Sequence, residues 1–218
     1  MDHGNTEKIS NNSFGAIVAR AGTGKTAIIV QLAIDTIFQN NAVLHVSLNE
    51  PVDKVSAWYK EVLSNLESLY NLDNIVTLWE SIESLRFIMT FKVEKFSVPT
   101  LKERLKDLTE QQIFKPKIVV IDGLPFDNSI TESLENLKDF SKEQNLHFWF
   151  TIMTHRHEKP THEGLPVQLS SFNQIFDDIV ELKPKNKKIY IESLKGHIEK
   201  NKKTKYFLDP STMLIRKI

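Results

Sequence analysis

The sequence predicts an α/β domain with a mostly parallel sheet, flanked by helices and edged by antiparallel carboxy-terminal strands. Three observations support this fold class. A glycine-containing loop at residues 19–26 lies between an apolar run and a helical pattern. The run Ile118–Asp122 has four β-branched apolar residues before one acid, as expected of a parallel strand covered on both faces. Strands alternate with helices along most of the chain and then follow one another directly, which indicates an antiparallel edge.

The spacing of apolar residues predicts each element in turn. Short continuous or alternating apolar runs predict strands, and apolar residues three and four positions apart predict helices. The expected strands are 13–19, 42–48, 75–79, 118–122, 148–153, 178–182, 188–194 and 205–217, with a turn at 209–212 inside the last. The expected helices are 25–40, 51–69, 97–113, 130–145 and a short one at 170–176. Residues 81–96 carry mixed helical and extended signals, and residues 155–170 have the composition of a long polar loop.

Length and composition restrict the class of protein. The chain has 218 residues, enough for a single domain with a sizeable core, which we expect at 13–218 after a flexible arm at 1–12. The absence of cysteine excludes disulfides and thiolate metal sites, and fits a cytoplasmic protein. No apolar run approaches the length of a membrane span, so no membrane partner is expected. The net charge is zero, so no overall field directs the chain toward nucleic acid.

The loop before the first helix has the character of a phosphate-binding loop, with the sequence Ala19-Arg20-Ala21-Gly22-Thr23-Gly24-Lys25-Thr26. Backbone N–H groups of this loop and of the helix N-terminus would face phosphate oxygens. We expect residues 21–26 to bind the triphosphate of ATP, with Lys25 at the β- and γ-phosphates and the Thr26 hydroxyl on Mg²⁺. Ala19 stands where the pattern G-x-x-x-x-G-K-[ST] has glycine, and a methyl group is harmless there if φ is negative.

Three further polar residues end or follow predicted strands, at the edge where ligands collect in parallel sheets. Asp122 would hold Mg²⁺ through water beside the Thr26 hydroxyl, or would merely cap the loop that follows it. Glu50 would deprotonate an attacking water if the second strand lies near the first, or would be an acid favoured by a helix dipole. Thr154, with His155 after it, would contact the γ-phosphate or would simply end its strand.

Two other clusters admit both a functional and a structural interpretation. His155, His157 and His162 match no closed tetrahedral metal pattern, and no cysteine can complete one, so a solvated loop is favoured. Lysines crowd residues 183–205 and are opposed there mainly by two glutamates. These lysines either protect a sheet edge against pairing, or contact a polyanion or the nucleotide of a neighbouring subunit.

With these motifs, the chain resembles the RecA-like P-loop ATPase superfamily, and within it the branch of KaiC and the DnaB-like helicases. The resemblance rests on the phosphate loop, Glu50 after the second strand, the Ile118–Asp122 strand, and the segment Ser193-Leu194-Lys195-Gly196-His197. It implies a Mg²⁺-dependent ATPase that assembles with copies of itself into a ring or filament. By the same resemblance, Lys195 would act in catalysis on the nucleotide of the neighbouring subunit.

Three functions remain open from the sequence. The first is an ATP-driven motor of replication or recombination that acts on single-stranded DNA through the 155–170 loop. The second is a nucleotide-dependent signalling or scaffold protein that uses the same core without nucleic acid. The third is a small-molecule kinase, which is less favoured because the chain has few arginines and no arginine-rich lid. The motif does not distinguish ATP from GTP.

Overall fold

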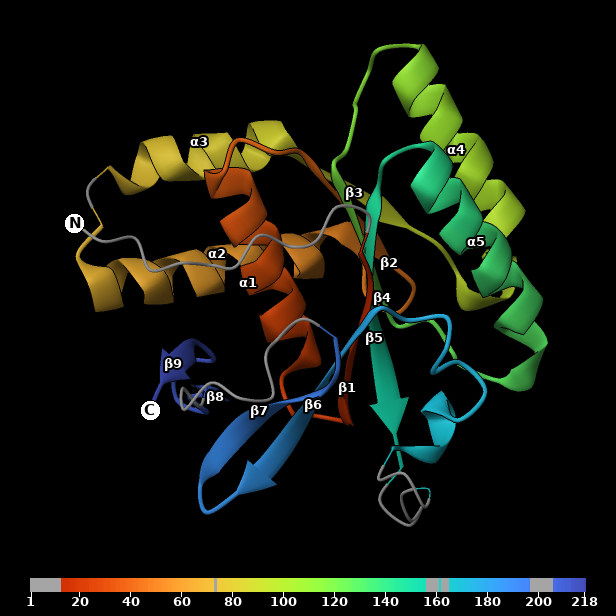
Figure 1. Cartoon of the computed structure of the whole chain (residues 1–218). Helices are drawn as coiled ribbons and strands as arrows, with labels where there is room; N and C mark the ends of the chain where they lie inside the picture. Colours follow the sequence, from red (N-terminus) through yellow and green to blue (C-terminus); the bar gives the residue numbers. More distant parts are fainter. Residues whose placement is uncertain (1–12, 73, 156–160, 162–164, 197–205) are drawn as a thin grey trace.

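The computed structural model describes residues 13–72, 74–155, 161, 165–196 and 206–218 (Figure 1). Its strands are β1 (Phe14–Arg20), β2 (Val43–Ser47), β3 (Arg86–Thr90), β4 (Ile118–Asp122), β5 (His147–Thr154), β6 (Asp178–Lys185), β7 (Lys188–Lys195), β8 (Tyr206–Leu208) and β9 (Ile215–Lys217). They form one sheet in the order β3-β2-β4-β5-β1-β6-β7-β8-β9. Strands β1 to β6 pair in parallel, and β7, β8 and β9 extend the sheet antiparallel at one edge. The predicted fold class is therefore confirmed, while the expected arm at 1–12 lies outside the described residues.

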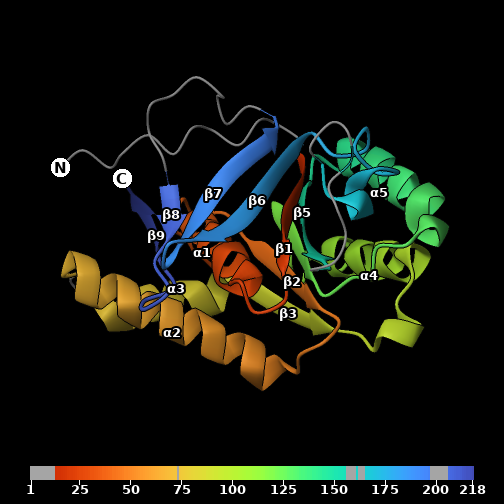
Figure 2. The same ribbon diagram turned by 90° about the horizontal axis from the view of Figure 1, so that it is seen from below.

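Helices cover both faces of this sheet, as Figures 1 and 2 show. The helices are α1 (Lys25–Phe38), α2 (Val52–Tyr70), α3 (Ile75–Leu85), α4 (Val98–Glu110) and α5 (Thr131–Glu143), with short 3-10 turns η1 (Val93–Lys95), η2 (Asn128–Ile130) and η3 (Val167–Leu169). Helices α1, α2 and α3 pack on one face, and α4 and α5 pack on the other. No helix in the described part of the chain is both long and apolar enough to cross a membrane.

The two cores explain why the central strands are apolar at almost every position. In β1, Ala16 and Val18 point into the core under α4 and α5, whereas Ile17 points into the core under α1. In β4, Val119 and Val120 divide in the same way. Side chains alternate between the faces of a strand, so a sheet covered on both faces needs continuous apolar runs.

The strand predicted at 75–79 is wrong, because these residues begin helix α3. Ile75, Leu78 and Trp79 pack against the core beside α1, and the same stripe continues one turn further to the buried Ile82. This spacing of three and four is helical, but a window of five residues is too short to show it. The strand that pairs with β2 is instead β3, which lies inside the segment with mixed signals.

The short helix predicted at 170–176 is also absent from the described structure, where hydrogen-bonded turns follow η3. The Phe172 N–H donates to the Leu169 carbonyl at 3.0 Å, and the Ile175 N–H donates to the Phe172 carbonyl at 2.9 Å. Phe176 at the end of this segment stacks on Phe14 with 5.6 Å between ring centroids. Aromatic burial, rather than helical hydrogen bonding, therefore holds the segment against the sheet.

Candidate functional site

The phosphate loop connects β1 to α1, and two glycines shape it. Gly22 and Gly24 have φ angles of 70° and 94°, a left-handed region that other residues rarely adopt. A Cβ atom at Gly24 would also clash with Leu208 Cδ2, whereas at Gly22 it would meet nothing within 4 Å. The space beside Gly22 is therefore open. Ala19 lies in β1 and is not among the residues with positive φ, so its methyl group causes no strain.

The side chain of Lys25 folds back onto the start of the phosphate loop. Its Nζ donates hydrogen bonds to the carbonyl oxygens of Ala19 at 3.2 Å and Arg20 at 3.0 Å. Burial lowers the pKa of Lys25, and the charge of Asp122 partly opposes this shift. Phosphate oxygens are stronger acceptors than neutral carbonyls, because their hydrogen bonds to an ammonium are charge-assisted. The side chain is therefore held at the loop, with two neutral carbonyl oxygens as its partners.

Thr26 and Asp122 meet at the first turn of α1. The Thr26 hydroxyl donates to Asp122 Oδ2 at 2.8 Å, and the hydroxyl of Thr151 in β5 donates to Asp122 Oδ1 at 2.5 Å. A hydroxyl and a carboxylate are the oxygen ligands that Mg²⁺ accepts, with water and phosphate as the remainder. Among the described residues, no group of three or more His, Cys, Asp or Glu side chains could hold a metal alone. The pair fits Mg²⁺, which is usually bound through one or two carboxylates plus substrate phosphates.

Strand order corrects the expectation that the second strand lies near the first, because β4 and β5 separate β2 from β1. Glu50 instead adjoins the strand that carries Asp122. Ser47 pairs with Asp122 in register, and the Leu48 N–H donates to the Asp122 carbonyl at 3.0 Å. The Glu50 carboxylate forms an ion pair with Lys54 at 3.2 Å, and its side chain is 41% exposed. Glu50 thus lies just beyond the carboxyl end of β2, and its carboxylate is directed at a lysine of α2.

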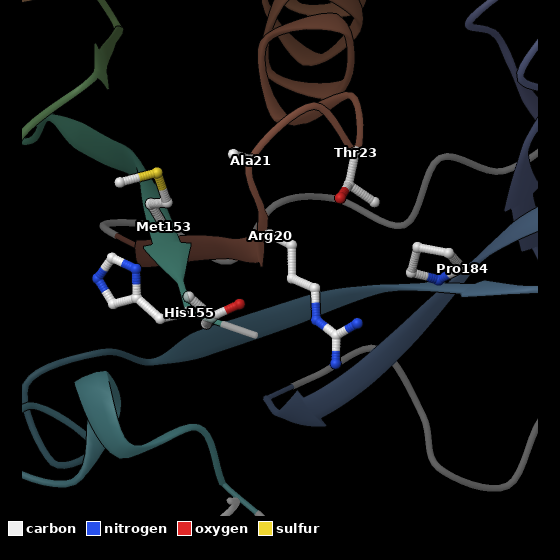
Figure 3. A pocket seen from close by; sticks show the side chains of 7 residues that line it. Arg20, Ala21, Thr23, Met153, His155 and Pro184 are labelled. Carbon is white, nitrogen blue, oxygen red and sulfur yellow. The ribbon is translucent and has the colours of Figure 1, made fainter. Parts of the chain in front are cut away.

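Thr154 ends β5, where it pairs in register with Arg20 at the start of the phosphate loop. A cavity of about 410 Å³ opens at this point, lined by Arg20, Ala21, Thr23, Met153, Thr154, His155 and Pro184. In Figure 3, Met153 and His155 lie on one side of Arg20 and Pro184 lies on the other. Thr154 and His155 therefore adjoin the phosphate loop, whereas His157 and His162 lie outside the described residues.

Lys195 lies at the amino-terminal ends of the parallel strands, whereas the phosphate loop lies at their carboxyl-terminal ends. It ends β7 and pairs with Ile179, near the amino-terminal end of β6, because β7 runs antiparallel to β6. Its Nζ donates to the Asn173 carbonyl at 2.6 Å. Within one subunit, Lys195 is therefore not part of the nucleotide site. Lys185, Lys187 and Lys188 lie instead at or beside the β6–β7 turn, next to Pro184 of the cavity.

Two buried polar side chains behind the site were not among the predicted site residues, Thr151 and His45. His45 Nδ1 lies 3.0 Å from the Tyr59 hydroxyl. Burial is the main cause that lowers the pKa of His45 to about 4, so the ring is neutral at pH 7. The sequence signal that could have identified both residues is a polar side chain inside an otherwise apolar strand. In a strand covered on both faces, such a residue needs a hydrogen-bond partner.

Comparisons with known proteins agree with this geometry. Residues 6–151, more than half of the chain, match the family model described as AAA domain. No curated protein matches the sequence. A solved structure that its title describes as an ATPase domain superposes with a TM-score of 0.70 at 16% identity, covering 95% of this chain and 86% of that chain. Identity at this level shows the fold alone. The chain belongs to the AAA domain family and has the RecA-like P-loop ATPase fold that its motifs predict.

Proposed function

We propose that this domain is a Mg²⁺-dependent ATPase that binds ATP at the 19–26 loop and hydrolyses it. The observation that supports this most is the contact of the Thr26 hydroxyl with Asp122 Oδ2 at 2.8 Å, one residue after Lys25. This contact places the Lys25 ammonium and two oxygen ligands, from Thr26 and Asp122, near one another. They lie at the carboxyl ends of the parallel strands, where such sheets bind their ligands. Membership of the AAA domain family supports the same activity.

Each residue of the site has a distinct role in this proposal. Lys25 would leave the carbonyl groups of Ala19 and Arg20 and donate to the β- and γ-phosphates. Thr26 would hold Mg²⁺ directly, and Asp122 would hold it through water. Backbone N–H groups of residues 21–24 would donate to phosphate oxygens. Bound Mg²⁺ would neutralise charge on the phosphoryl oxygens.

Glu50 would act as general base on the attacking water. Its strand neighbours β4, so the 48–50 bend lies beside Asp122. The ion pair with Lys54 must open first, which costs little because a half-exposed pair contributes about 1 kcal/mol or less. Thr154, at the end of β5, would contact the γ-phosphate and transmit the nucleotide state to the segment that follows.

ATP turnover of the purified chain tests this proposal, with and without Mg²⁺ and single-stranded DNA. We expect Mg²⁺-dependent hydrolysis and, for a nucleic-acid motor, stimulation by DNA that falls steeply with salt, because phosphate contacts release counterions. Mass photometry at each nucleotide state would show whether a ring or filament forms. Turnover that ignores DNA while the assembly mass follows ATP would favour the signalling or scaffold protein. Absence of Mg²⁺-dependent turnover in every condition would contradict the ATPase.

We further propose that Lys195 acts on the nucleotide of a neighbouring subunit. A head-to-tail interface joins two different surfaces of the same protein. Lys195, at the amino-terminal ends of the strands in one subunit, can therefore face the carboxyl-terminal ends of the strands in the next subunit. Lys195→Ala is then expected to lower turnover with little change in ATP affinity. The alternative is that Lys195 only holds the Asn173 carbonyl, at 2.6 Å, and supports the fold.

Mixing experiments separate these two roles of Lys195. In mixtures of Lys195→Ala with Glu50→Gln protein, some interfaces combine an intact Lys195 with an intact Glu50 and should recover activity. Lys117→Ala is a matched control, because Lys117 also lies at the amino-terminal ends of the strands and donates to a backbone carbonyl, that of Asn145 at 3.4 Å. If mixed assemblies form but never exceed the sum of their parts, Lys195 does not act between subunits.

A further inference from the structure

We propose that Thr151 is a positioning residue that fixes Asp122 and the Glu50 bend relative to each other. This inference rests on the proposed function, in which Asp122 holds Mg²⁺ and Glu50 activates water. Thr151 lies in the middle of β5, between the strand of Asp122 and the strand of the phosphate loop. Within the described part of the chain, the hydrogen bonds of its hydroxyl both go to the end of β4, so its action is through Asp122 and the turn after it.

A single hydroxyl makes two contacts at the end of β4. Thr151 Oγ1 donates to Asp122 Oδ1 at 2.5 Å and accepts from the Gly123 N–H at 3.1 Å. Thr151 is 2% exposed, so bulk water does not compete for either bond. The branched side chain of threonine is stiff at χ1, which makes its hydroxyl a fixed point. Thr151 therefore holds both the side chain of Asp122 and the backbone turn that follows it.

The first consequence concerns the orientation of the carboxylate. With Oδ1 held by Thr151, Oδ2 faces the Thr26 hydroxyl at 2.8 Å. Rotation of the carboxylate would break both charge-assisted hydrogen bonds, which are the stronger kind. Asp122 is thus held in the orientation that directs one oxygen at the proposed Mg²⁺ position. Partners of this kind behind a metal ligand typically change metal affinity or activity by about ten- to a hundredfold when removed.

The second consequence concerns the Glu50 bend. Gly123 has a φ of 90°, and a Cβ atom there would clash with Asn49 Nδ2. The turn after β4 therefore packs directly against the residue before Glu50. The Leu48 N–H adds a second link, since it donates to the Asp122 carbonyl at 3.0 Å. Through Gly123, the hydroxyl of Thr151 is connected to the bend that carries the proposed base.

A purely structural role for Thr151 makes different predictions, which variants can separate. Thr151→Val keeps the branched shape and removes the hydroxyl, whereas Thr151→Ser keeps the hydroxyl. Thr151→Cys keeps a weak donor of similar size and serves as a second variant if the valine protein does not fold. Thr36→Val is the matched control, because among the described residues the buried Thr36 hydroxyl bonds only to the Leu32 carbonyl of its own helix, at 2.8 Å.

The experiment measures ATP binding by calorimetry in EDTA and across a Mg²⁺ titration, together with single-turnover hydrolysis. We expect Thr151→Val to raise the Mg²⁺ concentration at half-saturation by about tenfold or more. ATP affinity in EDTA should match that of the unmodified chain. Thr151→Ser should restore the half-saturation point to within about twofold, and Thr151→Cys should fall between serine and valine, since a thiol is a weaker donor than a hydroxyl. Thr36→Val should change the melting temperature without moving the Mg²⁺ dependence.

Two results would overturn the inference in distinguishable ways. A valine or cysteine variant that melts earlier but keeps the Mg²⁺ half-saturation point of the unmodified chain would leave Thr151 as a satisfied core residue. In that case the proposed ATPase would stand. Failure of the unmodified chain to bind ATP more tightly with Mg²⁺ would instead overturn the proposed function, and the positioning role with it.

Discussion

Replacing Lys25 by alanine is expected to abolish measurable triphosphate binding while the fold remains intact. Lys25 Nζ already lies at the loop, within 3.2 Å of the Ala19 carbonyl and 3.0 Å of the Arg20 carbonyl. Bound phosphate would take its charge-assisted hydrogen bonds, each contributing about 1.5–3 kcal/mol. Loss of two such bonds weakens binding by at least about a hundredfold, since 1.4 kcal/mol is about a factor of ten.

Calorimetry with ATP and far-ultraviolet circular dichroism would check both halves of this expectation. Lys117→Ala is a matched control, because Lys117 also donates to a backbone carbonyl, that of Asn145 at 3.4 Å, but lies just before β4 at the amino-terminal edge of the sheet. The control should bind ATP as the unmodified chain does. Equal affinity of the Lys25→Ala protein and the unmodified chain would exclude the phosphate-loop assignment.

Replacing Glu50 by glutamine is expected to preserve ATP binding and to slow hydrolysis by about a hundredfold or more, the usual scale for a lost general base. Glutamine keeps the size of the side chain and removes the proton acceptor. The 48–50 bend should not change, since the Glu50 backbone is held by the Ser47 hydroxyl at 2.9 and 3.0 Å. Single-turnover hydrolysis with excess protein over ATP measures the chemical step directly.

Asp53→Asn separates the base from the alternative of a helix-start acid. Asp53 lies in the first turn of α2, where the helix dipole favours an acid, just as it would favour Glu50. If both carboxylates only stabilise the helix, the two variants should lose similar, small amounts of stability and none of the hydrolysis rate. A large rate loss confined to Glu50→Gln would support the base, and equal rates in both variants would exclude it.

The spacing of apolar residues predicted most of the fold, and it failed where an element is short or only partly buried. The strand around Val120 was recognisable because a buried parallel strand is a continuous apolar run. Helix α3 was mistaken for a strand because its stripe becomes helical only when the window reaches Ile82. Strand β3 was ambiguous because it lies at the sheet edge, and its residues Arg86–Thr90 are half-buried to exposed. Edge strands carry a weaker apolar signal than central ones.

The sequence by itself determined the placement of residues that are neighbours in the chain. Lys25 and Thr26 are brought to the loop by the first turn of one helix, so the motif alone places them. Asp122 is identified in the same way, as the acid that ends a buried strand.

Tertiary structure decided everything that depends on which strands lie side by side. The order of the sheet puts β5 between β4 and β1, and so brings Thr151 to Asp122. It puts β2 beside β4, so that Glu50 adjoins Asp122 instead of the phosphate loop. The antiparallel direction of β7 also places Lys195 at the amino-terminal ends of the parallel strands, away from the phosphate loop. Pairing between distant strands leaves no periodic signal in the sequence, since backbone hydrogen bonds set it and every residue except proline can make them.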